Sequence, residues 1–334
     1  MLSPGKIYSS LILIFLISAG IALSSCSKKF ISVTDTRIAL GSYVQITIIT
    51  STDNTTKTHD IIETAYKKIN ILGKDFDYRD EIGSLSLFNS SQHILKKNNE
   101  LLFSLIVESI SLTKLTNGYF DPTILPLVQL WCFDTDNPVL PHEAEIKDTL
   151  KLIGHNKVRV MGDRIIKPLS VKFDLSGIAK GKIVDLIRDY LRSRGYHNFL
   201  INAGGDIYVS GTTKDKTKWR IAIQDPVHED RYSGVVEKIN AAIVTSGDYE
   251  QFFIEGEVKY CHLFNPKTGY PFSDIKSVTI IADDTTFADA IATAVFSMGS
   301  KEGFSFLTRN NIQGFIIYIK DNNKIETKST PRFW

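Results

Sequence analysis

The sequence predicts an α+β protein, folded as one large unit in which a mostly antiparallel sheet is flanked by helices. Short β-rich segments joined by turns dominate the chain from residue 157 onward, which favours antiparallel strands. Long stretches with apolar residues at helical spacing lie before and between these segments. No linker rich in proline, glycine or serine divides the chain, so we expect a single folded domain.

Composition and charge narrow the class of partner. The chain has 334 residues, of which 43% are apolar and 23% charged, and its formal net charge is +2. This is the composition of a globular protein with a large core. Acidic and basic residues are mixed along the chain, and no basic stripe indicates nucleic acid as a partner.

The first 25 residues have the pattern of a secretory signal. Lys6 precedes the apolar run IYSSLILIFLISAGIAL, which is short for a stable membrane span. The run leads into Leu-Ser-Ser-Cys, ending at Cys26, which resembles the lipobox of bacterial lipoproteins. This resemblance implies cleavage before Cys26 and attachment of lipid, palmitate included, to its sulfur and new amino group. A plain signal peptide and an uncleaved anchor remain the alternatives.

These features divide the chain into three parts. Residues 1–25 are predicted to be a cleaved lipoprotein signal peptide, residues 26–36 a lipidated tether, and residues 37–334 the folded domain. We therefore expect a bacterial membrane lipoprotein that faces the periplasm or the cell exterior. Outside the cytoplasm, Cys132 and Cys261 could pair or remain two small buried thiols, and the sequence leaves both alternatives open.

The local patterns predict the elements of the domain in order. The first half should contain a strand at 38–50, an amphipathic helix within 55–80, a second helix at 99–118 and, after a proline-containing loop, a short helix at about 143–153. The second half should contain short strands at 157–162, 164–169 and 170–175, and segments that alternate strand and turn at 198–211, 218–226, 241–256 and 259–266. It should also contain a helix at about 178–194, a β-rich segment at 277–283 that leads into a helix beginning near Thr286, and a closing hairpin at 314–327.

The segment FDLSGIAKGKIVD, residues 173–185, is expected to end a strand at Asp174 and to open a helix through a glycine-containing turn. Exposed backbone N–H groups at the start of a helix suit an anion such as phosphate, and Lys180 could add a positive charge. The alternative is an ordinary strand-to-helix turn without a ligand.

The segment INAGGDIYVSG, residues 201–211, places Gly204-Gly205 directly after a strand. Glycines at this point permit left-handed backbone conformations and the close approach of a ligand. The alternative is a tight hairpin turn in which Asp206 bonds its own backbone.

A third region combines two turns with a histidine. Ser246-Gly247-Asp248 is expected to be a turn between strands, and His262 precedes Asn265-Pro266-Lys267-Thr268-Gly269, the pattern of a type I turn with proline at its second position. A histidine beside such a rigid turn could act as a general base or acid. The alternative is that His262 is only a satisfied polar residue.

The segment TTFADAIATAVFSMG, residues 285–299, reads as the start of an apolar helix. Thr286 as N-cap with Asp289 three residues later fits a capping box. Alternatively, Asp289 and Thr293 lie one turn apart on one helix face. They would then offer two hard oxygen donors to a Mg²⁺ site completed by backbone oxygen, water and substrate phosphate.

Together and in this order, these segments resemble the ApbE family of FAD:protein FMN transferases. NAGGDI matches a family block as it stands, and DLSGIAKG, TSGDYEQFF, HLFNPKTGYP and ADAIATAVFSMG are similar to other blocks. Upstream, SLSLFN and GYFDPTILPLV resemble two more. The matches extend from about residue 40 to residue 300, and the ordered set is specific although each block is short.

The resemblance implies an ApbE-like enzyme that splits the pyrophosphate of FAD with the help of Mg²⁺. FMN would pass to a Thr or Ser hydroxyl of an exported or membrane flavoprotein, and AMP would be released. The family suggests acceptor subunits of ion-pumping NADH or ferredoxin oxidoreductases, or exported flavin reductases. Two alternatives stay open, a Mg²⁺-dependent FAD pyrophosphatase that yields FMN and AMP, and a non-catalytic FAD-binding lipoprotein.

The resemblance also implies roles for individual residues. His262 would be the base that activates the acceptor hydroxyl, and Mg²⁺ would be bound by Asp289, Thr293 and the backbone carbonyl of Gly177. The residues that match FAD contacts are Leu40, Tyr78, Tyr119, Phe120, Asp121, Asp174, Lys180 and Leu263.

Three residues depart from the family pattern. Ser176 stands where glycine is common, and its small size should be tolerated. Gln251 replaces a common arginine, which we expect to loosen a substrate or structural contact. Asn265 replaces the usual aspartate and removes one charge beside His262, so we expect it to affect the catalytic rate.

Overall fold

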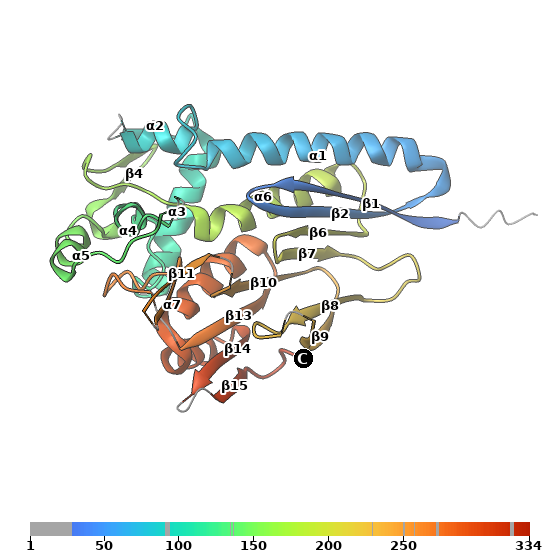
Figure 1. Ribbon diagram of the computed structural model, residues 1–334. Helices are drawn as coiled ribbons and strands as arrows, with labels where there is room; N and C mark the ends of the chain where they lie inside the picture. Colours follow the sequence, from blue (N-terminus) through green and yellow to red (C-terminus); the bar gives the residue numbers. More distant parts are fainter. Residues whose placement is uncertain are drawn as a thin grey trace, which may run out of the picture.

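The computed structural model describes residues 29–334, apart from residues 91–93, 134, 136, 229, 250, 257, 272–273 and 321–323. The predicted signal peptide and Cys26 lie outside the described residues. One large sheet, antiparallel throughout, crosses the molecule (Figure 1). Its strands, in spatial order, are β1 (Phe30–Ala39), β2 (Ser42–Ser51), β6 (Phe199–Ala203), β7 (Asp206–Ser210), β10 (Ala241–Gly247), β13 (Ile275–Ala282), β14 (Gln313–Lys320) and β15 (Lys324–Ser329). The α+β class predicted from the sequence is confirmed.

Long helices cover one face of this sheet. They are α1 (Thr55–Asp75), α6 (Ser176–Ser193) and α7 (Thr285–Arg309), and α3 (Glu100–Leu115) packs in turn against α6 and α7. The existence of all four helices was predicted. Ile46 and Ile201, which point from adjacent strands toward these helices, belong to the same buried cluster as the helices' apolar residues. Among the helices that the structure describes, none is long and apolar enough to cross a membrane.

The opposite face of the sheet is covered by a hairpin made of β8 (Trp219–Gln224) and β9 (Tyr232–Lys238). Val209 and Ile243 of the main sheet pack there with Ile221 and with Phe333 near the C-terminus. Because the central strands are buried on both faces, they read in the sequence as apolar runs more than as clean alternation.

Smaller elements complete the fold beside the main sheet. They are the sheet β3 (Ile94–Lys96), β5 (Arg164–Ile166) and β4 (Arg159–Met161), the hairpin β11 (Phe252–Glu255) and β12 (Val258–Cys261), the helices α2 (Ser84–Ser90), α4 (Leu125–Trp131) and α5 (Glu143–Leu150), and 3-10 turns at Thr52–Asn54 and His155–Lys157. Trp131 centres an aromatic cluster between α4, α5 and β11–β12, and its Nε1 donates to the Gly269 carbonyl at 3.1 Å. The short helix predicted at 143–153 and the closing hairpin are confirmed.

The N-terminal part of the domain differs from the prediction. Residues 30–36, expected to be part of a tether, form most of β1, so the folded region extends upstream of residue 37. β1 pairs with β2 over its whole length, because an antiparallel ladder satisfies the backbone groups of a strand that is polar on one face. Leu40 and Gly41 form the turn between them, with φ of 53° and 72°. The prediction of a single strand at 38–50 was therefore wrong, because this range contains the end of β1, the turn and most of β2.

Other local expectations were wrong as well. Residues 170–175, expected to be a strand, make one isolated bridge, from Lys172 to Ile124, within the described chain. Ser246 and Gly247, expected in a turn, end β10. α4 forms where a proline-containing loop was expected, because Pro126 lies in the first turn of the helix, where its missing N–H costs nothing.

Cys132 and Cys261 are both free thiols in the structure. Burial raises the pKa of the Cys261 thiol to about 11, so this thiol is protonated near neutral pH and is a poor nucleophile. Of the two alternatives left open by the sequence, the structure therefore corresponds to separate thiols.

Candidate active site

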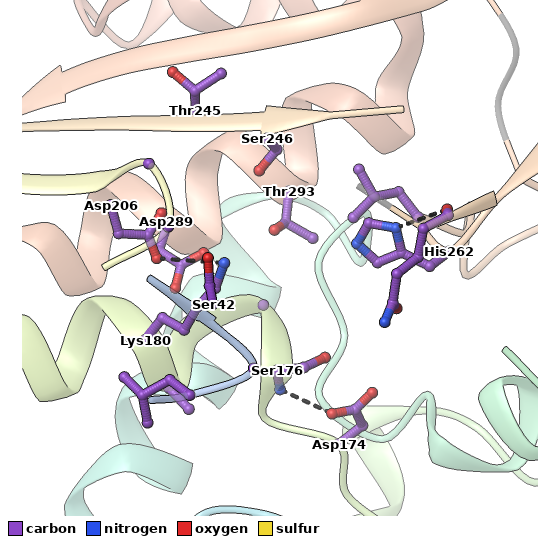
Figure 2. Close-up of a pocket in the computed structure, with 18 of the residues that line it drawn as sticks. Ser42, Asp174, Ser176, Lys180, Asp206, Thr245, Ser246, His262, Asp289 and Thr293 are labelled. Carbon is purple, nitrogen blue, oxygen red and sulfur yellow. Dashed lines mark hydrogen bonds and ion pairs between the residues drawn. The ribbon is translucent and has the colours of Figure 1, made fainter. Parts of the chain in front are cut away.

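A cavity of about 1140 Å³ lies beside the N-terminal parts of α6 and α7, at the ends of several strands of the main sheet (Figure 2). Every site residue predicted within the described chain lines it: Leu40, Tyr78, Tyr119, Phe120, Asp121, Asp174, Gly177, Lys180, His262, Leu263, Asp289 and Thr293. These residues come from segments far apart in the sequence, so the fold brings the motifs together in one place.

Two glycines allow the β1–β2 turn to form part of the cavity wall. A Cβ on Gly73 would lie 2.6 Å from Leu40 Cδ2, and a Cβ on Gly204 would lie 2.6 Å from Ser42 Oγ. Leu40 itself adopts a left-handed backbone conformation, which is uncommon for a non-glycine residue. The turn is therefore held tightly against α1 and the β6–β7 connection.

The Gly204-Gly205 pair forms the two-residue turn between β6 and β7, with φ of 64° and 99°. The Oδ1 atom of Asn202 accepts the Gly205 N–H at 3.0 Å. The hairpin alternative had instead assigned the bond to the turn backbone to Asp206. The nearly buried carboxylate of Asp206 instead lies 4.0 Å from the ammonium of Lys180. The turn is thus a hairpin turn and a wall of the cavity at the same time.

The start of α6 is distorted where it meets α7. The backbone leaves the helical conformation at Gly177 (φ −82°, ψ 17°). A Cβ on Gly177 would lie 3.1 Å from Thr293 Oγ1, so the absence of a side chain allows this close approach. Before the helix, Asp174 accepts the Ser176 N–H at 2.8 Å. Burial raises the pKa of the Asp174 carboxyl, partly offset by that N–H bond.

Asp289 joins the two helices. Its Oδ2 accepts the N–H of Gly181, in α6, at 3.0 Å, and its side chain is almost completely buried. In a regular helix the Gly181 N–H would bond to the Gly177 carbonyl. Asp289 therefore takes a donor of the neighbouring helix just where α6 is distorted.

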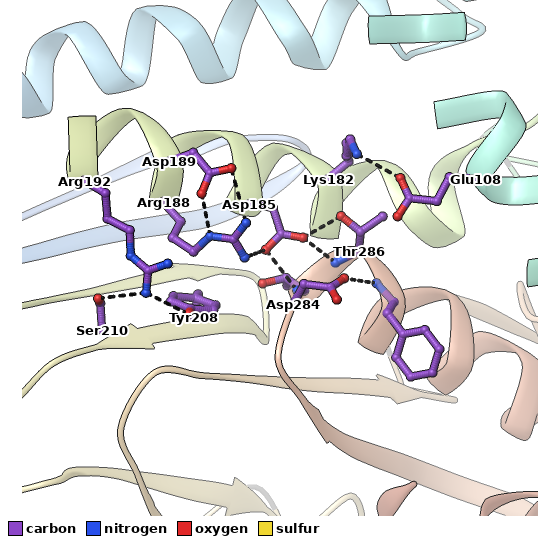
Figure 3. A network of polar contacts seen from close by, with 12 residues as sticks. Glu108, Lys182, Asp185, Arg188, Asp189, Arg192, Tyr208, Ser210, Asp284 and Thr286 are labelled. Carbon is purple, nitrogen blue, oxygen red and sulfur yellow. Dashed lines mark hydrogen bonds and ion pairs between the residues drawn. The ribbon is translucent and has the colours of Figure 1, made fainter. Parts of the chain in front are cut away.

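α7 begins differently from the sequence prediction (Figure 3). Its N-cap is Asp284, whose carboxylate accepts the Phe287 N–H at 2.8 Å. The predicted cap, Thr286, lies inside the first turn. The N–H groups of Thr285 and Thr286 donate to Asp185 of α6 at 3.0 and 2.8 Å. A carboxylate of a neighbouring helix thus satisfies donors that the sequence pattern assigned to a local cap.

The oxygen atoms near Asp289 form the part of the cavity suited to a cation. The described residues contain no cluster of three or more His, Cys, Asp and Glu side chains with the geometry of a metal site. The predicted ligands on this wall are the Asp289 carboxylate, the Thr293 hydroxyl and the nearby Gly177 backbone, and the Asp206 carboxylate lies beside Asp289 (Figure 2). Such a set fits a hard cation that keeps water and substrate oxygens among its ligands, and does not fit a closed zinc site.

His262 follows β12 at another side of the cavity. The carbonyl of Gln251 accepts the His262 N–H at 3.0 Å and lies 3.2 Å from Nδ1 of its ring. Because a carbonyl can only accept, Nδ1 carries the proton in this contact and Nε2 is left as the accepting nitrogen. The contact uses the backbone of Gln251, so the departure from arginine at this position does not alter it.

The turn after His262 is confirmed, with the Thr268 N–H donating to the Asn265 carbonyl at 3.2 Å. The Asn265 side chain is buried and donates from Nδ2 to the Ser297 carbonyl of α7 at 3.2 Å, while its Oδ1 accepts the Lys267 N–H at 2.9 Å. An ionised aspartate could not make the first of these bonds. Asn265 therefore fastens the turn to α7.

Two of the predicted FAD contacts are already engaged by the protein. The Asp121 carboxylate accepts N–H groups of Thr123 and His155 at 2.9 and 3.2 Å, so it shapes the wall. The Tyr119 hydroxyl donates to Glu302 at 2.7 Å. Their side chains are held in place before any ligand enters.

The sequence interpretation missed several polar residues of the cavity. Ser42, Asp206, Thr245 and Ser246 line it and were not assigned to the site. Ser42 follows the β1–β2 turn, which was not predicted. The other three flank the glycines of NAGGD and TSGD, so polar residues next to glycine at a strand end were the signal available.

The chain is similar to known proteins over most of its length. The model of the ApbE family matches residues 40–316. The FAD:protein FMN transferase of Vibrio cholerae serotype O1 is 34% identical over 232 residues, covering 68% of this chain and 70% of the relative. The FAD:protein FMN transferase of Haemophilus influenzae is 28% identical over 340 residues, covering 96% of each chain.

Solved structures show the same architecture. The flavin transferase ApbE from Vibrio cholerae has a TM-score of 0.80 at 29% identity, covering 92% of this chain and 98% of that structure. The ApbE protein from Thermotoga maritima has a TM-score of 0.80 at 32% identity, covering 89% and 96%.

Replacing Asp185 by alanine should destabilise the α6–α7 contact. The buried N–H groups of Thr285 and Thr286 would lose their acceptor, which should lower the free energy of unfolding by about 2–4 kcal/mol. Urea denaturation measures this loss. The matched control is Asp189→Ala, which also pairs with Arg188 but is 60% exposed, with an expected loss of at most ~1 kcal/mol. If both variants lost the same free energy of unfolding, the effect would come from the ion pair with Arg188 and not from the N–H groups of α7.

Replacing Asp174 by asparagine should raise the melting temperature at pH 7. Because burial raises the folded-state pKa of this carboxyl above its ordinary value of 3.8, its ionised form opposes folding above that pH. The gain, on the order of 2 °C, should vanish as pH falls below the ordinary pKa, where the carboxyl is protonated in both states. The exposed Asp163→Asn is the control, and a lower melting temperature for Asp174→Asn at pH 7 would contradict the argument.

Proposed function

This chain belongs to the ApbE family, and on that premise we propose that it is an FAD:protein FMN transferase that moves FMN to a Thr or Ser hydroxyl of an acceptor protein. The observation that carries the proposal is the convergence of three groups on one cavity. Lys180 and the N–H groups at the start of α6 can bind a pyrophosphate. The wall formed by Asp289 and Thr293 can bind a cation that neutralises the charge of the pyrophosphate. His262 can accept the proton of a hydroxyl nucleophile.

The dimensions and lining of the cavity support a substrate as large as FAD. Its volume of about 1140 Å³ lies slightly above the roughly 300–1,000 Å³ that is usual for small-molecule sites. The aromatic residues of the cavity can pack against the isoalloxazine and adenine rings of FAD; they are Tyr78, Tyr119 and Phe120. Leu40 and Leu263 offer apolar contacts. We assign Asp121 and Asp174 to the polar wall that surrounds the same substrate.

We propose that Asp289, Thr293 and the Gly177 carbonyl hold a Mg²⁺ ion. Support comes from the approach of the Gly177 backbone to Thr293 Oγ1 and from the loss of helical geometry at Gly177. Asp289 is buried and can accept further bonds beside the one from Gly181. When bound, Mg²⁺ would neutralise charge on the pyrophosphate oxygens.

The residues of the chain then have separate tasks in the transfer. His262 Nε2 takes the proton of the acceptor hydroxyl while the hydroxyl oxygen forms a bond to the phosphorus of the FMN half. The bond from that phosphorus to the bridging oxygen breaks, and AMP leaves with this oxygen. The Gln251 carbonyl keeps the proton on Nδ1, and Lys180 provides positive charge near the phosphates.

We also propose that the enzyme is anchored through lipid on Cys26 and acts on an exported or membrane flavoprotein. The support is the signal-like N-terminal sequence with its Leu-Ser-Ser-Cys motif, which lies outside the described residues. We propose subunits of ion-pumping NADH or ferredoxin oxidoreductases as acceptors, because the family resemblance suggests them. Recovery of the full chain in the soluble fraction of its cell would contradict the anchor.

The transferase activity is tested by weighing the acceptor. The protein should be incubated with FAD, Mg²⁺ and the unmodified flavin-carrying subunit domain of an ion-pumping NADH oxidoreductase, referred to below as the acceptor domain. The acceptor domain should gain the mass of one FMN, with one AMP released for each adduct, and EDTA should stop both. AMP without an adduct would indicate an FAD pyrophosphatase, and bound FAD without either product would indicate a binding protein.

Replacing His262 by alanine should slow transfer while FAD still binds. Loss of a general base should lower the transfer rate by about 100-fold or more, because the hydroxyl would lose its proton acceptor. Single-turnover transfer and flavin fluorescence measure the two effects. The control is Gln251→Ala, which keeps the backbone carbonyl and should transfer at nearly the wild-type rate. Unchanged transfer by His262→Ala would remove His262 as the base.

A further inference from the structure

The β11–β12 hairpin carries an exposed apolar face directly beside the candidate base. Phe252 and Ile254 are two residues apart in β11, so they point to the same face, and they are 46% and 62% exposed. Lys259, the cross-strand partner of Ile254, lies on that face too. We call Phe252, Ile254 and Lys259 the hairpin face.

The hairpin face begins close to His262 along the chain, and Cys261, which lies between them, is buried in the main core. Phe252 pairs with Cys261, the residue that precedes His262, and cross-strand partners lie about 5 Å apart. The carbonyl of Gln251, the residue before Phe252, accepts hydrogen bonds from the backbone N–H and from the ring Nδ1–H of His262. Phe252 therefore lies at the end of the hairpin that holds His262, and Ile254 and Lys259 lie further from the cavity along the hairpin.

The hairpin is held from its other face. Phe253 and Tyr260 pack on Trp131, with ring centroids 6.3 and 5.5 Å from it. On the hairpin face, the Lys259 ammonium lies 4.0 Å from the centre of the Phe252 ring and 3.2 Å from the Asp248 carboxylate. These contacts orient Phe252 without covering it, so the face is pre-organised for a partner.

We propose that the hairpin face binds the acceptor protein, through an extended segment that carries apolar side chains beside its Thr or Ser hydroxyl. The inference rests on the proposed function, because transfer to a protein requires a segment of that protein to reach His262 Nε2. Phe252 and Ile254 offer such a segment an exposed apolar contact close to the base. In the described chain this sheet has two strands, so an extended segment can also pair along an outer edge.

The test uses the acceptor domain with three forms of the enzyme. These are the wild type, the double variant Phe252→Ser with Ile254→Ser, and the control Ile325→Ser. The control removes an isoleucine that is 39% exposed on β15, an edge strand of the main sheet remote from the hairpin (Figure 1). The measurements are FMN transfer against acceptor concentration, and FAD affinity by flavin fluorescence.

The double variant should raise KM for the acceptor domain by about tenfold or more, with unchanged FAD affinity and nearly unchanged kcat. The control should behave as the wild type. An unchanged KM, or a fall in FAD affinity that accounts for the loss, would overturn the docking proposal while the transferase stands. If the wild type transfers no FMN to the acceptor domain, the proposed function fails and the docking proposal fails with it.

Discussion

Two carboxylates join α6 and α7 at the ends that face the candidate active site. Asp185 of α6 accepts the first N–H groups of α7, and Asp289 of α7 accepts the N–H of Gly181. Gly181 makes this contact possible, since a Cβ there would lie 2.4 Å from the Thr285 carbonyl oxygen. The two helices meet almost backbone to backbone, so this contact sets the relative position of the two helix segments that line the cavity.

Asp289 shows why a structural and a chemical role need not compete. A carboxylate has more accepting positions than one N–H can fill, so holding Gly181 leaves capacity for a cation. The same bond draws a donor away from the regular pattern of α6 at the point where Gly177 is distorted. The interaction that fastens the helices thus also prepares the oxygen-rich wall on which the proposed metal site depends.

The two sides of the cavity are built in different ways. The side formed by α6 and α7 lies in the main core, where buried groups such as Asp174 oppose folding in their charged form, a common cost of a functional site. His262 follows a small hairpin that an aromatic cluster fastens on one side, while its chain neighbours Cys261 and Leu263 belong to the main core. The candidate base and the α6–α7 wall thus reach the same cavity from different elements.

The sequence alone determined the features encoded by local patterns: the long helices, most strands, and, through the order of the ApbE-like motifs, a set of residues that line one cavity. Only the tertiary structure decided features that depend on distant partners. Thr286 has the local pattern of an N-cap, yet its N–H bonds to Asp185, 101 residues earlier. The polar β1 became a strand because β2 pairs with it, and Asn265 fastens a turn because Ser297 lies opposite. A local pattern specifies which bonds a residue can make, whereas the fold specifies which partner is within reach.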